Sequence, residues 1–315
     1  MVGYEYLEKG VWGLANAHRA GPLAGHLGAA LLAGYFLGED HGDWPAGVFA
    51  GIQSELDRIL RGEEAIWFNP RQAGLTVGDL FKPLAGGRPV RDADRQIAAA
   101  LRTSMDRLRQ SGHNVIFGSL AIRAVQDHPD LATPRAIDGL VRLMRQFATQ
   151  RQGRGYYGKA KGWKYGHEVQ LTDSQTVHYR DLSDMLRRTL DETARMAGVH
   201  RRGFGGLWHL INHAAGLLEL HRRGFRDLAE LGRTAHARHL ALLRTLPDVS
   251  AEFGAYTAAA HDPRDPAYWK DMLKRDEARL THRIKTLYGF FAIAERVSDA
   301  AARRRAEHAF LYLMA

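Results

Sequence analysis

The spacing of apolar residues is that of an α-helix along almost the whole chain, with apolar positions recurring three and four residues apart. No stretch alternates apolar and polar residues in the way that predicts a β-strand. Clusters of proline and glycine separate most of the periodic stretches. The pattern therefore predicts an all-α protein with helices over residues 4–17, 22–37, 46–61, 93–110, 114–126, 134–150, 180–196, 205–222, 225–246, 267–296 and 299–314.

Two kinds of helix are expected from the distribution of apolar residues. Residues 93–110 form an amphipathic pattern, with Ile97 and Leu101 on the apolar face and arginines on the opposite face. Residues 23–37, 114–125 and 205–220 are apolar nearly all round, which is typical of helices buried on every side. A layer of buried helices inside a layer of amphipathic ones predicts a two-layer α/α toroid, or a doubly wrapped helical bundle, with a central cavity.

The composition fits a single large domain over residues 1–315. Of the 315 residues, 45% are hydrophobic and 25% are charged, which is enough to bury a large core. The first residues carry charges too early for a secretory signal. The longest apolar stretch, residues 22–37, is too short for a convincing membrane span. We therefore expect a cytoplasmic protein with no membrane span.

Cysteine content and net charge limit the chemistry further. The chain has no cysteine, which excludes disulfides, zinc–thiolate sites, iron–sulfur clusters and thiol nucleophiles. Any transition metal would have to be held by imidazole and carboxylate. The net charge of +9 favours anionic partners such as nucleic acid, anionic lipid or a phosphate-bearing cofactor. Arginine-rich solvated faces give the same total with no partner.

Five histidines occur near the expected N-terminal ends of apolar helices: His26, His113, His209, His213 and His282. In a toroid the inner helices run the same way, so these side chains are expected to meet at one end of the cavity. The positive end of a helix dipole keeps an imidazole neutral, and a neutral imidazole acts as a base or a metal ligand.

His209 and His213 are four positions apart and share one helix face, which suggests a metal site for a His-ligated transition metal. A lone histidine on an apolar helix is more often a core residue bonded to a carbonyl or a carboxylate, and that alternative stays open. His236 and His239 are an alternative second cluster. Seven histidines, including His236 if it does not belong to such a cluster, are expected mostly at the surface: His18, His41, His128, His200, His221, His236 and His308.

Residues 151–167 concentrate glycines, cations and aromatics in what is expected to be a loop. The glycines at 153, 155 and 158 match G-x-G-x-x-G, but no strand precedes them, so the dinucleotide-binding signature fails on context. Glycines still allow close approach to phosphate, and the aromatics are able to stack on bases. A mobile lid or linker is the alternative. The candidate cofactor-binding cations are Arg151, Arg154, Lys159, Lys161 and Lys164.

Several short segments that contain histidine resemble the histidine-containing helices of the questin oxidase-like proteins. They are His209-Leu-Ile-Asn-His213 with Gly216-Leu-Leu-Glu-Leu220, and His282-Arg-Ile-Lys285. His26-Leu-Gly-Ala-Ala-Leu and His113-Asn-Val-Ile resemble that family's earlier histidine helices. The likeness consists of short islands across most of the chain. The chain is shorter than expected for the family and carries the basic segment at 151–167.

The resemblance implies an oxidoreductase that uses NADPH to oxygenate a small aromatic molecule of the polyketide type. It implies that His209 or His213 is a base or metal ligand, and that His26, His113 and His282 orient a substrate oxygen or complete the set of metal ligands. Lys285 or Arg123 would stabilise an oxyanion, and the basic segment would cover the cofactor phosphate. The aromatic residues expected to wall the substrate site are Trp208, Phe204, Trp67, Phe68, Phe117 and Tyr288.

Two other functions remain open from the residues alone. A histidine–metal hydrolase would retain zinc or iron and need no NADPH. A basic all-α protein would bind RNA or single-stranded DNA through the 151–167 segment. Neither the substrate nor the oligomeric state is predicted by the sequence.

Overall fold

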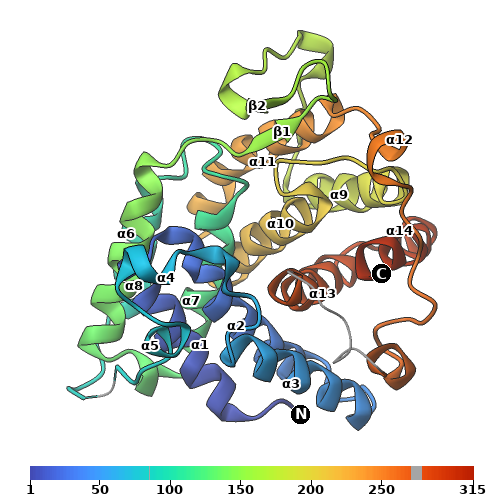
Figure 1. Cartoon of the computed structure of the whole chain (residues 1–315). Helices are drawn as coiled ribbons and strands as arrows, with labels where there is room; N and C mark the ends of the chain where they lie inside the picture. The colour runs from blue at the N-terminus through green and yellow to red at the C-terminus, as the bar shows by residue number, and fades with distance from the viewer. Residues whose placement is uncertain (85, 271–278) are drawn as a thin grey trace. The chain divides into compact units, whose positions relative to one another are not determined.

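The computed structural model describes residues 1–84, 86–270 and 279–315, and over this part of the chain the protein is all-α, as predicted (Figure 1). The α-helices are α1 Tyr4–Asn16, α2 Gly25–Asp40, α3 Ala46–Leu60, α4 Pro70–Ala73, α5 Val77–Leu80, α6 Ala93–Arg102, α7 His113–Asp127, α8 Pro134–Gln146, α9 Leu182–Met196, α10 Gly206–Arg222, α11 Arg226–Thr245, α12 Ser250–Phe253, α13 Leu280–Ala294 and α14 Ala300–Met314.

The chain folds into two compact units. Unit 1 consists of residues Met1–Ser104, Ile116–Ala148 and His261–Tyr288. Unit 2 consists of residues Met105–Val115, Thr149–Ala260 and Gly289–Ala315. The helices α7 and α13 therefore contribute residues to both units. A single domain, and a toroid around a central cavity, stay predictions.

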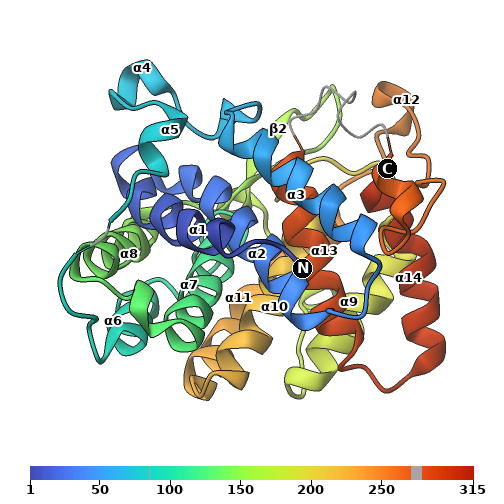
Figure 2. The same ribbon diagram turned by 90° about the horizontal axis from the view of Figure 1, so that it is seen from below.

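In unit 1 the buried helix is α2, which packs against α1 and α3, while α8 packs against α1 and α6 (Figure 2). Leu27, Leu31 and Phe36 of α2 are fully buried. Each such side chain contributes roughly 1.5–3 kcal/mol by leaving water. The all-round apolar pattern of α2 thus corresponds to a helix enclosed by its neighbours.

In unit 2 the corresponding helix is α10, which packs against α9 and α11. Leu210, Ile211 and Leu217 of α10 are fully buried. α14 packs against α9. Phe310 of α14 stacks on Phe290, with ring centroids 4.0 Å apart. The buried face of α10 carries His209 and His213 into this core.

A β-hairpin interrupts the helical pattern, so the expectation of a loop without strands is wrong at this point (Figure 1). Strands β1 (Arg154–Tyr156) and β2 (Trp163–Tyr165) pair antiparallel. Three residues are too few for a period-two pattern to stand out. The backbone of β1 also bonds outside the hairpin, because Tyr156 N–H donates to Arg202 O and Arg154 O accepts from Phe204 N–H.

The largest differences between expected and observed helices concern the ranges 93–110 and 267–296. α6 ends at Arg102 and not at residue 110. The hydroxyl groups of Thr103 and Ser104 donate to the carbonyls of Ala100 and Leu101, and such local bonds compete with helix continuation. In place of a helix over 267–296, residues Pro266–Trp269 form a 3-10 turn, residues 271–278 lie outside the described part, and α13 starts at Leu280.

None of the helices in the described ranges combines the length and the apolar character that a membrane crossing requires.

Candidate functional site

Each of the two units contains buried histidines. In unit 2 they come from the start of α7, the first half of α10 and the middle of α11. All its members are buried, and we call them the unit 2 histidine cluster: His113, His209, His213, His236 and His239. Three of the five were predicted as catalytic residues from the sequence.

A hydrogen bond with a defined donor and acceptor joins the rings of His113 and His209. The Nε2 atoms of the two rings lie 2.9 Å apart. His209 Nδ1 lies 2.8 Å from the carbonyl oxygen of Gly205, which can only accept, so Nδ1 carries a proton. In a neutral His209 ring Nε2 is then an acceptor, and His113 Nε2–H donates to it. The pair therefore has defined tautomers.

The turn before α10 positions His209. Gly203, Phe204, Gly205 and Gly206 all have positive φ, and Gly205 has a φ of 75°. A Cβ atom at Gly205 would lie 2.3 Å from the His209 ring, so only glycine allows this approach. Phe204 has a φ of 49°, a conformation that costs a non-glycine residue about 1–2 kcal/mol. Strain of this kind is concentrated at functional sites.

His213 lies deeper in the core and is 1% exposed. Among the described residues, neither of its ring nitrogens has a hydrogen-bond partner. Its ring centroid lies 5.1 Å from that of His236 and 5.8 Å from that of His239. Burial, reinforced by these neighbouring imidazoles, holds the pKa of His213 well below its usual value. The ring is therefore neutral at neutral pH, with one donor and one acceptor free.

His236 and His239 are buried on α11, so the surface placement expected for His236 is wrong, and His41 is likewise buried. Burial lowers the pKa of His236 to about 3 and that of His239 to about 4. His236 Nε2–H donates to Leu210 O at 3.1 Å, and His239 Nε2–H donates to Phe204 O at 2.7 Å. The spacing of Gly232, His236 and Leu240 along one apolar stripe was the signal in the sequence.

In unit 1 the buried His26 and His282 both contact the indole of Trp67, His26 by stacking and His282 edge-on. His26 lies in the first turn of α2 and stacks on Trp67, with ring centroids 3.6 Å apart. His282, in the first turn of α13, lies 5.1 Å from both rings. Phe117 meets the edge of His26 at 5.3 Å. Trp67 and Phe117 therefore lie against His26, and their role as walls of a substrate site stays a prediction.

Lys285 is buried one turn after His282 and interacts electrostatically with the buried Glu64. Burial lowers the pKa of Lys285 to about 7, and burial raises the pKa of Glu64. Glu64 Oε2 accepts the backbone N–H of Thr281 at 2.7 Å, which fixes the carboxyl group at the start of α13. Both shifts favour the neutral forms of the two groups, as is common for buried groups at functional sites. Nothing in the local sequence distinguishes Glu64 from a surface residue.

Arg123, the alternative oxyanion group, is already neutralised. Its guanidinium donates to both carboxylate oxygens of Asp40, at 2.7 and 2.8 Å, and also contacts Glu39 and Asp127. It lies 3.9 Å above the ring of Phe36. Arg123 and these carboxylates therefore form a network of ion pairs within unit 1.

The five cations of residues 151–167 lie on or beside the hairpin. Arg154 covers the rings of Trp163 and Tyr165 at 5.6 and 5.8 Å, and Lys164 covers Tyr157 at 5.8 Å. The hairpin amides of Tyr157 and Gly162 are bonded within the hairpin. The backbone therefore does not form a phosphate cradle. A cofactor phosphate would be held by side-chain charge alone, from Arg151, Arg154, Lys159, Lys161 and Lys164.

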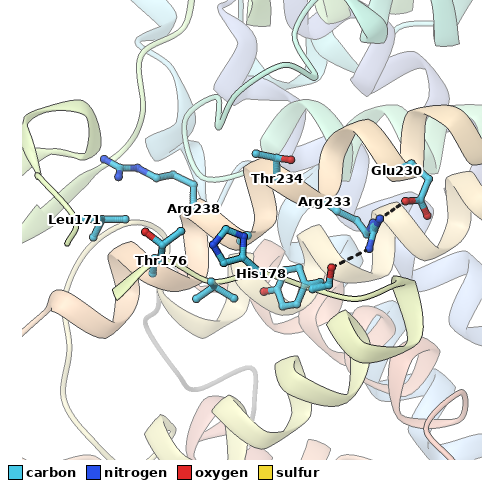
Figure 3. Close-up of a pocket in the computed structure, with 11 residues that line it drawn as sticks. Leu171, Thr176, His178, Glu230, Arg233, Thr234 and Arg238 are labelled. Carbon is cyan, nitrogen blue, oxygen red and sulfur yellow. Dashed lines mark hydrogen bonds and ion pairs between the residues drawn. The ribbon is translucent and has the colours of Figure 1, made fainter. Parts of the chain in front are cut away.

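A cavity of about 380 Å³ lies in unit 2 between α11 and the segment 171–179 (Figure 3). One of its walls, Tyr179, connects it to the histidine cluster, because the Tyr179 hydroxyl lies 2.9 Å from His236 Nδ1. Burial raises the pKa of Tyr179, so the hydroxyl stays protonated and donates inward. No sequence pattern pointed to Tyr179 as a functional residue.

Comparisons with protein-family models, curated proteins and solved structures found no match to this chain. The resemblance to questin oxidase-like proteins therefore stays a prediction from the residues quoted above.

Proposed function

We propose that this chain is an enzyme in which His213 binds and polarises an oxygen-bearing group of a small, largely apolar molecule. The observation that supports the proposal is a fully buried imidazole with no hydrogen-bond partner among the described residues. A buried polar atom without a partner destabilises a fold by roughly 1–3 kcal/mol, so such atoms call for a functional explanation.

The chemistry available to His213 follows from its neutrality. A neutral imidazole donates one N–H to an oxygen that becomes negative, and its other nitrogen accepts a proton from a hydroxyl group. The two neighbouring imidazoles are neutral as well, since burial lowers their pKa values to about 3 and about 4. His213 and its two neighbours on α11 therefore bring no charge of their own to this core at neutral pH.

The reaction class that we propose is NADPH-linked oxygenation, and it rests on the resemblance of the histidine islands alone. NADPH would supply hydride when bound. The hairpin offers charge for its phosphates but no backbone cradle, so no catalytic step follows from the hairpin.

A metal between His209 and His213 is less well supported. Both ring nitrogens of His209 are engaged, with Gly205 O and with His113. In the unit 2 histidine cluster, His213 and Nδ1 of His239 are without partners among the described residues. Catalytic zinc sites usually take three protein ligands. The metal assignment stays a hypothesis, and we base no step on it.

The test is turnover by purified full-length protein. Oxygen uptake and NADPH oxidation are measured with a panel of hydroxylated naphthoquinones and anthraquinones. We expect turnover of at least one compound, reduced about 100-fold or more in His213→Gln. The control is His221→Gln, farther along α10, which should retain turnover.

Two results would count against the proposal. Unchanged turnover in a folded His213→Gln protein would remove His213 from the reaction. Absence of NADPH and oxygen consumption by the wild-type protein with every compound would exclude the oxygenase assignment for this substrate class.

A further inference from the structure

The cavity of Figure 3 combines apolar walls with two arginines at opposite ends. Arg233 and Arg238 both extend from α11. The apolar walls come from Leu171, Val177, Ala237 and Ala241. A cavity of about 380 Å³ falls in the range that holds small organic molecules.

The two arginines differ in their partners. Arg233 forms an ion pair with Glu230 and donates to Tyr179 O at 3.4 Å, as the dashed lines in Figure 3 show. Arg238 has no carboxylate within ion-pair distance among the described residues. The hydrogen bonds that it makes there are to backbone carbonyls, Gly166 O at 2.8 Å and Val169 O at 2.7 Å.

The carbonyl bonds hold Arg238 in place but leave its charge without a counter-ion. Partial burial consequently lowers the pKa of Arg238 from its usual value. A guanidinium has further N–H donors beyond those used for the two carbonyls, in a planar array suited to carboxylate or phosphate. Thr176 adds a hydroxyl group to the cavity wall.

We propose that this cavity binds a small organic anion, with a carboxylate or phosphate on Arg238 and an apolar body along Val177, Ala237 and Ala241. An anion would supply the missing counter-charge, while the Arg233–Glu230 pair already balances the other end. Binding at this place requires neither His213 nor turnover, so it stands apart from the reaction proposed above.

The experiment is calorimetric titration of the full chain, without NADPH, with four probes: 2-naphthoate, 2-naphthyl phosphate, 2-naphthalenemethanol and inorganic phosphate. At least one of the two naphthyl anions should bind, and the neutral alcohol should bind at least about tenfold more weakly, as expected for loss of a charged hydrogen bond. Tighter binding of 2-naphthoate or of 2-naphthyl phosphate identifies the head group. Inorganic phosphate should bind more weakly than the naphthyl anions, because it lacks the apolar body.

Matched variants identify the site. Arg238→Gln should weaken anion binding about tenfold or more. Arg226→Gln removes the same charge from an exposed position on the same helix and should leave binding within about twofold. Since Arg238→Gln also removes the bonds to Gly166 and Val169, a second variant, Ala237→Leu, fills the apolar part of the cavity and should weaken binding with Arg238 intact.

Three results would overturn the inference: no heat with either naphthyl anion for folded wild-type protein, equal affinity for the neutral alcohol, or an equal effect of Arg226→Gln and Arg238→Gln.

Discussion

At the scale of single residues, two neighbouring imidazoles of the same core have opposite energetic roles. His236 is bonded at both ring nitrogens, to the Tyr179 hydroxyl and to Leu210 O. His213 is bonded at neither among the described residues. A bonded buried imidazole stabilises the core, whereas one without partners destabilises it, so the two residues should respond in opposite directions to the same substitution.

His213→Leu should raise the free energy of unfolding by about 1–2 kcal/mol, because two buried polar atoms without partners are replaced by apolar ones. Turnover should be lost in the same protein, which is the trade-off expected for a functional residue. Urea denaturation measures the first effect. A decrease in stability of more than about 1 kcal/mol would show that His213 makes a stabilising contact.

His236→Leu should lower the free energy of unfolding by about 2 kcal/mol or more, because the Tyr179 hydroxyl and Leu210 O each lose their partner. The same denaturation experiment measures it. Equal stability of the His236→Leu and wild-type proteins would contradict the assigned hydrogen bonds.

At the scale of elements, the first turns of four helices carry the sites. His26, His113, His209 and His282 lie in the first turns of α2, α7, α10 and α13. Apolar periodicity predicted the starts of α2, α7 and α10 within three residues, whereas the helix of His282 was predicted from residue 267 and α13 starts at Leu280. The turn before α10 was not predictable in detail, because a positive φ at Phe204 results from backbone bonds to a strand fifty residues earlier in the sequence, at Arg154.

Gly205→Ala should lower the free energy of unfolding by more than about 2 kcal/mol, because it adds left-handed strain and a clash of Cβ with the His209 ring. Gly224→Ala is the control, since Gly224 follows α10 with a φ of 92° and has open space around its Cβ position. Gly224→Ala should lower the free energy of unfolding by about 1 kcal/mol, from backbone strain alone. Equal losses in the two variants would show that the His209 ring is not held against the turn.

The same elements show where reading the sequence fails. Lys285 was named because the segment His282-Arg-Ile-Lys285 carries part of the resemblance to questin oxidase-like proteins, and its role stays a prediction. Glu64 and Tyr179 were missed, because their partners Thr281 and His236 are distant in the sequence and meet them only in the tertiary structure. The hairpin was missed because its strands are short, and the end of α6 because Thr103 and Ser104 bond to the preceding turn.

At the scale of the whole molecule, the all-α class was predictable because helical periodicity covers most of the chain, and it is confirmed. The clustering of histidines was predictable only in part. His113 and His209 do meet in unit 2, and His26 and His282 do meet in unit 1. The involvement of His239 and the burial of His236 depend on how α11 packs against α10.

The buried neutral histidines make the stability of the whole protein depend on pH. In the folded state the pKa values of His236 and His239 are lowered to about 3 and about 4, from an ordinary value of 6.5 in the unfolded chain. Below pH 6.5 the unfolded chain binds protons that the folded protein does not bind. Stability is therefore complete above that pH and falls as the pH decreases towards about 4.

These two residues should together contribute a slope of about 2.7 kcal/mol per pH unit over that window. Urea denaturation at several pH values measures it. His239→Gln should remove about half of the contribution. A free energy of unfolding that does not change between about pH 6.5 and about pH 4 would contradict the burial of neutral imidazoles.

The proposed role of His213 requires a neutral ring, and ¹⁵N NMR of protein labelled at histidine, with the signal assigned by His213→Gln, measures its protonation directly. We expect a neutral ring, with one protonated and one unprotonated nitrogen, that does not titrate near the ordinary value of about 6.5. An imidazolium ring, with both nitrogens protonated and a midpoint near the ordinary value of about 6.5, would contradict it.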